Sequence, residues 1–484
     1  MLILFLKKLI TMKKTKIATI KLSPSLTLLG MAGLLGNACA ADSTPAVSHS
    51  SDWAKPAWLT DLVVGVKESY DDNVMGVADK MPGMSAHASW ISTASPKVGF
   101  NFAPLFGPQK TLQTFSLVYA PEFAIFHNAP SESYNAHKIA NVIKGQTGDF
   151  SFSADNAFLF NDGNSVAPTY ALDQSSVAAD QADKYRSNFA HGMARERRKQ
   201  IQDRATVALR YDVNKFFLRP TASLLYYDLM TDLHNTSKAP YKGYQNYIDR
   251  ADVNGGMDLG YKVTADLALT VGYRYGHQYQ AALPYAIDTA MVNGNQMQSS
   301  SDYQRLLLGL EGKPWTWLTV KLAGGPDFRD YNSAAPVNDL HPVKFYGEAA
   351  ITAAITENQS LTFAFKQWQW VASTGKIPSL DSSYGLAYHW NATKQLGFDL
   401  GGKIQNADFT SGNVTTGSAG SLRNDILYTI STGVSYAFTT HFNASLSYAC
   451  DFGRNLQDNL PANLYADYRE FDHQVVSLAA QFKF

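Results

Sequence analysis

The sequence predicts a single all-β domain, a closed transmembrane antiparallel β-barrel of about 18 strands, with about 16 strands as the open alternative. Three observations predict it. An export signal begins the chain, no later stretch is apolar enough to cross a bilayer as a helix, and segments of alternating polarity follow one another to the C-terminus. A bilayer core offers no water to free backbone groups, so only helices and closed barrels can span it. An exported, membrane-embedded chain without such helices must therefore form a barrel.

The first 40 residues have the features of a secretory signal peptide. A lysine-rich segment precedes the apolar stretch Leu26–Leu35, and Ala38-Cys39-Ala40 forms a small-residue cleavage site. An uncleaved anchor is the alternative, although the apolar stretch is short for a bilayer. We expect a signal peptide at 1–40, a polar periplasmic lead-in at 41–57 and the barrel at 58–484. Cleavage leaves Cys450 as the single cysteine, which excludes an internal disulfide.

The composition is typical of β-structure between two solvents. Lys and Arg number 41 against 41 Asp and Glu, so the chain has no net charge to attract nucleic acid. Charged residues make up 17% of the chain, below the roughly 25% usual in soluble domains. Tyr and Phe number 26 each. A large soluble β-sandwich could share this composition, so the pattern along the chain must decide between the two.

The final segment shows the pattern most clearly. Val476, Leu478 and Phe482 alternate with Ser477 and Gln481, as in a strand with one lipid face and one water face. The predicted strands span 60–72, 88–102, 111–126, 135–145, 150–160, 200–212, 216–230, 247–262, 267–280, 302–312, 317–330, 343–355, 360–371, 382–392, 395–409, 423–438, 441–452 and 468–484. Short turns and long loops alternate between them, which is typical of outer-membrane barrels with both termini in the periplasm.

Aromatic residues gather near the predicted strand ends and predict two girdles at the lipid–water boundaries. Ordinary packing within the fold is the alternative for about one third of them. One group lies by short turns: Phe216, Phe217, Trp315, Trp317, Phe438 and Phe442. The other lies toward long loops: Tyr275, Tyr279, Phe328, Trp368, Trp370, Tyr384 and Phe471. The chain ends on Phe484, which resembles the terminal aromatic signal that the barrel-assembly machinery binds.

Several short motifs resemble a family of outer-membrane β-barrel porins whose solutes are mostly unassigned. They are Tyr70-Asp71-Asp72-Asn73, Pro96-Lys97-Val98-Gly99-Phe100, Ser116-Leu117-Val118-Tyr119-Ala120-Pro121-Glu122 and Asn135-Ala136-His137. They cover only the first hairpins. The resemblance implies an outer-membrane location and a porin-like channel, and it supplies no catalytic residue.

A barrel of this size encloses water, so we expect the charged residues of the strands on the inner face. Taking the face opposite the apolar one gives a predicted pore-lining set. Its members are Lys67, Lys97, Glu122, Arg210, Arg219, Asp258, Lys262, Arg274, Arg305, Glu311, Lys321, Lys344, Glu348, Lys366, Asp399 and Lys403. Cations outnumber acids in this set, which favours a mild anion preference. Ion pairs that only brace the wall are the alternative, and both interpretations stay open.

The longest predicted loop, 161–199, contains a basic run and is a candidate constriction. Arg195, Arg197, Arg198 and Lys199 could bind an anionic solute if the loop enters the pore. A solvated basic loop beside lipopolysaccharide is the alternative interpretation.

Signals for catalysis are weak. His389 and Asn391 share one predicted strand, and Asp472-His473 lies near the outer rim, but neither pair makes a catalytic motif. We expect no enzyme activity, no cofactor and no metal. The sequence favours passive diffusion of small hydrophilic solutes across the bacterial outer membrane, in contact with lipid and lipopolysaccharide. A structural or adhesive barrel and an outer-membrane hydrolase are the alternatives, and a serine beside His389 across the sheet would favour the hydrolase.

Overall fold

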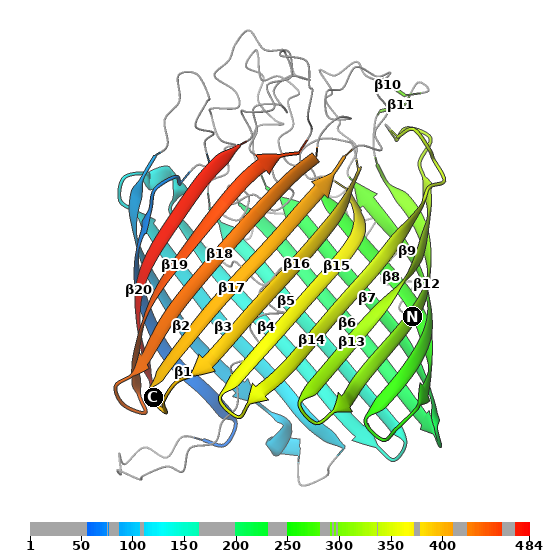
Figure 1. Cartoon of the computed structure of the whole chain (residues 1–484), viewed down its shortest axis with the longest axis horizontal. Coiled ribbons are helices and arrows are strands. Elements are labelled where there is room, and N and C mark those ends of the chain that lie inside the picture. The colour runs from blue at the N-terminus through cyan, green and yellow to red at the C-terminus, as the bar shows by residue number, and fades with distance from the viewer. Residues whose placement is uncertain are drawn as a thin grey trace, which may run out of the picture.

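A computed structural model of the chain shows an 18-stranded closed antiparallel barrel, which confirms the predicted fold class (Figure 1). The structure describes residues 56–74, 76, 87–106, 111–163, 199–230, 249–280, 291–292, 295–296, 299–335, 337–371, 378–409, 424–456 and 470–484. The predicted signal peptide and most of the lead-in lie outside these residues. Both strands between 135 and 160 exist, so the 16-strand alternative is wrong.

The barrel strands are β1 (Leu59–Asp71), β2 (Ser89–Asn101), β3 (Leu112–Phe126), β4 (Tyr134–Thr147), β5 (Phe150–Asp162), β6 (Gln200–Val213), β7 (Phe216–Leu229), β8 (Arg250–Lys262), β9 (Leu267–Gln280), β12 (Ser301–Trp315), β13 (Leu318–Tyr331), β14 (Val343–Thr356), β15 (Gln359–Val371), β16 (Pro378–Asn391), β17 (Leu396–Asp408), β18 (Asn424–Ala437), β19 (Phe442–Asn455) and β20 (Phe471–Lys483). Two 3-10 turns and a small outer hairpin complete the described elements: η3 (Ala103–Phe106), η4 (Pro130–Glu132), β10 (Met291–Val292) and β11 (Asn295–Gln296). No described helix is both long and apolar enough to cross a membrane.

Every strand pairs with its neighbours along the chain, and β20 pairs with β1 to close the sheet. Closure gives every barrel strand a neighbour on both sides, so the sheet has no free edge strand. Gly148 and Asn214 begin the short turns β4–β5 and β6–β7, with φ of +57° and +54°. Glycine and asparagine tolerate this left-handed conformation, so the local sequence permits these tight reversals.

The two faces of the wall differ as period-two alternation predicts. Leu308, Val66 and Leu478 lie on the outer face and are 71%, 55% and 60% exposed. Contacts that jump over several strands identify the concave inner face, because two side chains can bridge non-neighbouring strands only through the interior. Arg219 on β7, for example, reaches Glu311 on β12, past β8 and β9.

The predicted girdles are correct for nine of their residues and wrong for four. The outward aromatics are Phe216, Trp315, Trp317, Phe438, Phe442, Tyr275, Tyr279, Phe328 and Tyr384. Phe217, Trp368, Trp370 and Phe471 instead have inward register. Nearness to a strand end does not fix the face; position parity does, because adjacent residues point to opposite sides of the sheet.

Candidate functional site

The strand register places every charged residue predicted for the pore on the inner face. The same register adds acids that the sequence-based set omitted, including Asp212, Asp252 and Asp327. Asp212 pairs with Arg210 and Asp327 with Arg305, whereas Asp252 accepts hydrogen bonds from Tyr303 and Gln278. The cationic surplus of the inner face is therefore smaller than the sequence-based set indicates.

A lower ion-pair network crosses the inner wall from β6 to β12. Arg219 contacts Asp258 through Nε at 3.0 Å and Glu311 through Nη1 at 2.8 Å. Arg274 reaches the other oxygen of Asp258 at 2.7 Å. Arg210 pairs with Asp212 at 2.9 Å, and its Nη1 is 3.7 Å from Glu311. The arginine side chains here are 16–28% exposed, so they are held in place while still partly solvated.

Phe217 anchors this network rather than a girdle. Its ring is 1% exposed and lies against Gly260, where any side chain would collide with it. The Arg210 guanidinium stacks on the ring, with Cζ 3.7 Å from the centroid. A cation over an aromatic face is attracted to the ring's negative quadrupole. The ring therefore fixes the position of the Arg210 guanidinium beside Asp212 and Glu311.

An upper network is more deeply buried. Arg305 and Arg329 both contact Asp327 at 2.8 Å, and the three residues are 7%, 3% and 1% exposed. The Arg305 guanidinium lies 4.1 Å from the ring centroids of both Tyr303 and Tyr346. A buried, fully paired and sandwiched cation contributes little to the field in the water-filled lumen. For Arg305 the geometry favours the bracing interpretation.

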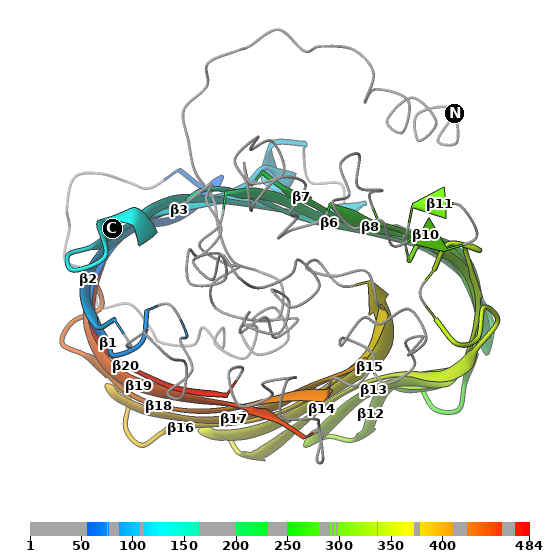
Figure 2. The same cartoon turned by 90° about the horizontal axis from the view of Figure 1, so that it is seen from above.

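This burial arises because the upper end of β15 and β16 leaves the wall. β14 pairs with β15 only as far as Gly347–Gln367, whereas β15 and β16 stay paired to Val371–Pro378. We call the protruding part, residues 368–371 and 378–379, the inward tip. Figure 2 shows the end of β15 bending into the barrel interior. Adjacent strands are about 4.8 Å apart, so a contact from β15 to β9, four strands away, spans a chord of the lumen.

Polar and aromatic contacts hold the inward tip against the far wall. The backbone oxygen of Gln369 accepts hydrogen bonds from Gln278 on β9 at 3.0 Å and Arg329 on β13 at 3.3 Å. Trp370 packs on Tyr227 of β7, and the Arg250 guanidinium lies 4.9 Å from the Trp370 ring. Together these contacts place a fixed obstruction in the upper lumen. The sequence marks the start of this segment by a change of phase: the apolar positions pass from Phe363 and Phe365 to Trp368 and Trp370 across the polar pair Lys366-Gln367.

The basic loop predicted as a constriction falls mostly outside the described part of the chain. Arg195, Arg197 and Arg198 are not described. Lys199 is described at the outer end of β6, where its Nζ lies 3.1 Å from Asp162. The described chain thus supplies its own narrowing element in the inward tip of β15 and β16.

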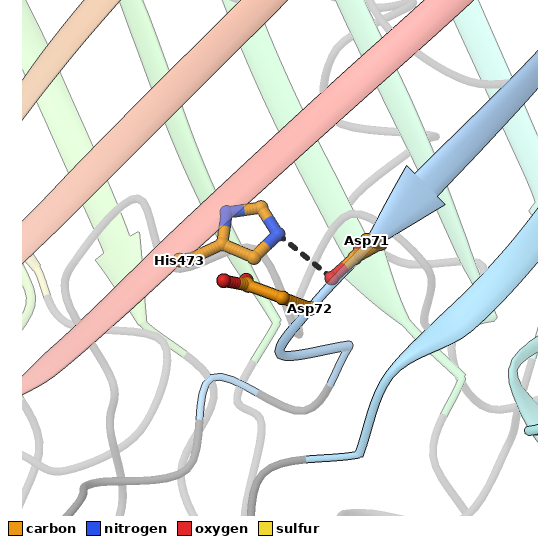
Figure 3. A group of neighbouring side chains, drawn as sticks. All are labelled: Asp71, Asp72 and His473. Atoms are coloured by element: carbon orange, nitrogen blue, oxygen red, sulfur yellow. Dashed lines mark hydrogen bonds and ion pairs between the residues drawn. The ribbon is translucent and has the colours of Figure 1, made fainter.

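One group at the outer rim has the composition of a metal site. Ligand atoms of Asp71, Asp72 and His473 lie within 4.8 Å of one another, and the three side chains point toward a common centre (Figure 3). However, His473 Nε2 is 3.0 Å from Asp71, and Asp72 accepts the backbone N–H of Gln474 at 2.7 Å. The atoms that would bind a cation are already hydrogen-bonded, so this geometry is complete as a structural latch.

The test for a hydrolase gives a mixed result. The register places Ser360 directly opposite His389, and His389 Nδ1 lies 2.8 Å from Asp399. A nucleophile needs a hydrogen bond to its base. No such bond joins Ser360 to His389, and Asp399 is 56% exposed. Serine, histidine and aspartate thus occupy one row of the sheet without the contact that would activate the serine.

Comparisons with known proteins give only distant structural similarities. No protein-family model and no curated protein matches the chain. Solved structures that resemble it include OccAB3 of Acinetobacter baumannii, with TM-score 0.39 and 11% identity over 88% of this chain and 99% of that one. The outer membrane protein OpdK of Pseudomonas aeruginosa gives TM-score 0.38 and 10% identity over 88% and 99%. Outer-membrane expressed OmpT of Vibrio cholerae gives 0.31 and 11% over 89% and 99%.

Proposed function

We propose that the chain forms a porin-like channel in the bacterial outer membrane, through which small hydrophilic solutes diffuse passively. The observation that carries the proposal is the sidedness of the closed wall: a mainly apolar outer face and an inner face that holds most of the charged residues of the strands. A wall of this kind separates lipid from a water-filled lumen. The expected contacts with lipid, lipopolysaccharide and the assembly machinery belong to the same proposal.

The narrowest path, in this proposal, runs past the inward tip. Solutes entering from outside meet the tip first and then the partly exposed arginines of the lower network. Lys67, Lys321 and Lys344 also have inward register and form no ion pair among the described residues. Fixed cations in a narrow lumen enrich anions. Because most arginines are paired, we expect the anion preference to be mild.

Planar-bilayer recording of the purified, refolded barrel tests the proposal. We expect stepwise single-channel conductance and, under a salt gradient, a reversal potential displaced toward the anion value. Replacing Lys321 and Lys344 with Ala should move the reversal potential toward cations at 0.1 M salt and much less at 1 M, where the Debye length falls from about 10 Å to about 3 Å. Absence of conductance from a folded barrel would favour the adhesive alternative instead.

A hydrolase is the second candidate because Ser360, His389 and Asp399 share one row. Hydrolysis of p-nitrophenyl esters by the folded barrel, abolished by Ser360→Ala, would support it. We expect the unaltered protein and the Ser360→Ala variant to hydrolyse the ester at the same rate, since Ser360 has no hydrogen bond to His389.

A further inference from the structure

The outer wall of β3 to β6 carries a group of polar side chains at membrane depth. Asn141 and Asn156 are directly opposite each other, each near the middle of its strand. Asp203 shares its face of β6 with Val207 and Leu209, which are 44% and 39% exposed. These three residues therefore point away from the lumen. With Tyr119 and His137 they form what we call the outer polar patch.

Elsewhere the outward polar side chains of the described strands, such as Glu68 on β1 and Gln367 and Ser382 on β15 and β16, lie nearer the upper strand ends. Leu308, Leu386, Ile430, Leu446 and Leu478 hold the middle of other outer faces, all at least 49% exposed. A wall that faces only lipid should be apolar throughout its central band, because hydrocarbon cannot hydrogen-bond to amides or carboxylates. Asn141 and Asn156 break this rule at the middle of the wall, on β4 and β5.

Part of the patch is satisfied internally. Asn156 Nδ2 donates to Asp203 Oδ1 at 2.5 Å, and the Tyr119 hydroxyl is hydrogen-bonded to His137 Nδ1. The Asn141 amide makes no side-chain hydrogen bond, and Asp203 has no cationic partner, within the part of the chain that the structure describes. Two donors on Asn141 and free acceptor positions on Asp203 and Asn156 are left facing the membrane.

We propose that this face is the contact surface between copies of the chain in the membrane, and that the outer polar patch lies within that contact. A partner must present polar groups at the same depth. A second copy inserted in the same orientation does so necessarily, because rotation about the membrane normal keeps every residue at its height. The patch is also self-complementary: Asn141 of one copy offers donors, and Asn156 and Asp203 of the other offer acceptors.

The surroundings suit close approach. Ala205 lies opposite Asn156 in the register, and Ala222 follows on β7. Small residues let two walls come near enough for hydrogen bonds between them. In Figure 2 the barrel is oval, and the stretch from β3 to β8 forms one of its long, gently curved sides. The inference does not depend on what passes through the lumen.

Site-directed cross-linking in outer-membrane fragments tests the proposal. In a Cys450→Ser background, Ala205→Cys leaves the polar patch intact, and Thr432→Cys provides a matched outward position on the opposite wall. With a bis-maleimide, we expect Ala205→Cys to give a product of twice the mass and Thr432→Cys to stay at the single-chain mass. Equal yields at both positions, no product at Ala205, or a product with a different protein would overturn the proposal.

A second arm removes the polar groups. The triple variant Asn141→Leu, Asn156→Leu and Asp203→Leu, combined with Ala205→Cys, should lower the cross-linking yield about tenfold, the change that one lost polar contact produces in an equilibrium constant. Heat-modifiable mobility on gels shows whether this variant folds. Measuring the mass of the unaltered protein in mild detergent is a test that needs no variant. A single-chain mass there would also overturn the proposal.

Discussion

His473 Nε2 lies 3.0 Å from Asp71 Oδ1 across the seam where the last strand meets the first. Nδ1 of the same ring lies 3.2 Å from Asp451 on β19. A neutral imidazole has one N–H to donate, and an ionised carboxylate only accepts. With both carboxylates ionised, the ring must therefore be the doubly protonated cation. One buried histidine thus joins β19, β20 and β1 at the outer rim.

His473→Ala should destabilise the barrel by about 3–5 kcal/mol, because it leaves the buried Asp71 and the half-buried Asp451 carboxylates without their cation. Urea unfolding in lipid vesicles, followed by tryptophan fluorescence, measures the change. His441→Ala is the control, since the exposed His441 ring stacks on Phe482 and is hydrogen-bonded to the backbone oxygen of Lys483 but meets no carboxylate among the described residues. A loss no larger than that of the control would show that the latch has no energetic role.

Arg305→Ala should cost stability and leave ion selectivity almost unchanged, because Arg305 is buried and paired with Asp327. We expect a loss of about 3–5 kcal/mol in the same unfolding assay, as for removal of one partner from a buried pair. Lys344 has inward register and forms no ion pair among the described residues. Lys344→Ala should therefore shift the reversal potential and leave stability almost unchanged. A shifted reversal potential in folded Arg305→Ala protein would place this arginine in the conducting path.

Trp370→Ala should release the inward tip and raise single-channel conductance. The ring contacts both Tyr227 and Arg250, and its loss should widen the path or make the current noisier. Trp390→Ala at the outward, lower end of β16 is the matched control, and it should leave the conductance unchanged. If both variants conduct like the unaltered protein, the tip does not narrow the path.

Cysteine labelling should distinguish the two faces of β1. Val66 is 55% exposed on the outer face, and Lys67 has inward register. In a Cys450→Ser background, a water-soluble maleimide should modify Lys67→Cys in membranes and leave Val66→Cys unmodified. The reverse result would mean a register error of one residue, which exchanges the faces of a strand.

Deletion of Phe484 should reduce the amount of barrel in the outer membrane. Its backbone N–H donates to Leu62 at 2.9 Å, and its ring packs edge-on against Phe482. These contacts are small, so the deletion should scarcely change the stability of barrel refolded in detergent. A normal outer-membrane level would show that the terminal ring is not needed for assembly.

The strands could be predicted because alternation is a local property of the sequence. Counting parity on each segment placed Arg219, Lys321 and Lys403 on the inner face without tertiary information. The same count, applied to every polar residue, also puts Asp212 and Asp327 on the inner face, where they pair with Arg210 and Arg305. It would also have shown Asn141 and Asn156 on the face reserved for lipid.

The inward tip could not be predicted in this way. The apolar positions of β15 change from Phe363 and Phe365 to Trp368 and Trp370, which marks the place where β15 leaves β14 near Gln367 but does not say where the strand goes. The departure depends on partners from β7 to β13 that are distant in the chain. The wrong prediction for Phe217 and Phe471 has a related cause, since an aromatic residue near a strand end can lie on either face of the sheet.

The pairing of β1 with β20 has a consequence for how the barrel folds. Tyr70 and Val476 are neighbours in the sheet although about 400 residues separate them in the chain. Hairpins between successive strands can form early, but this last ladder must wait until nearly the whole chain is present. Contacts of such long range slow folding, because loop-closure entropy is lost before the contact contributes. Until then both end strands expose unpaired backbone, so the unclosed sheet is the stage at which self-association competes with closure.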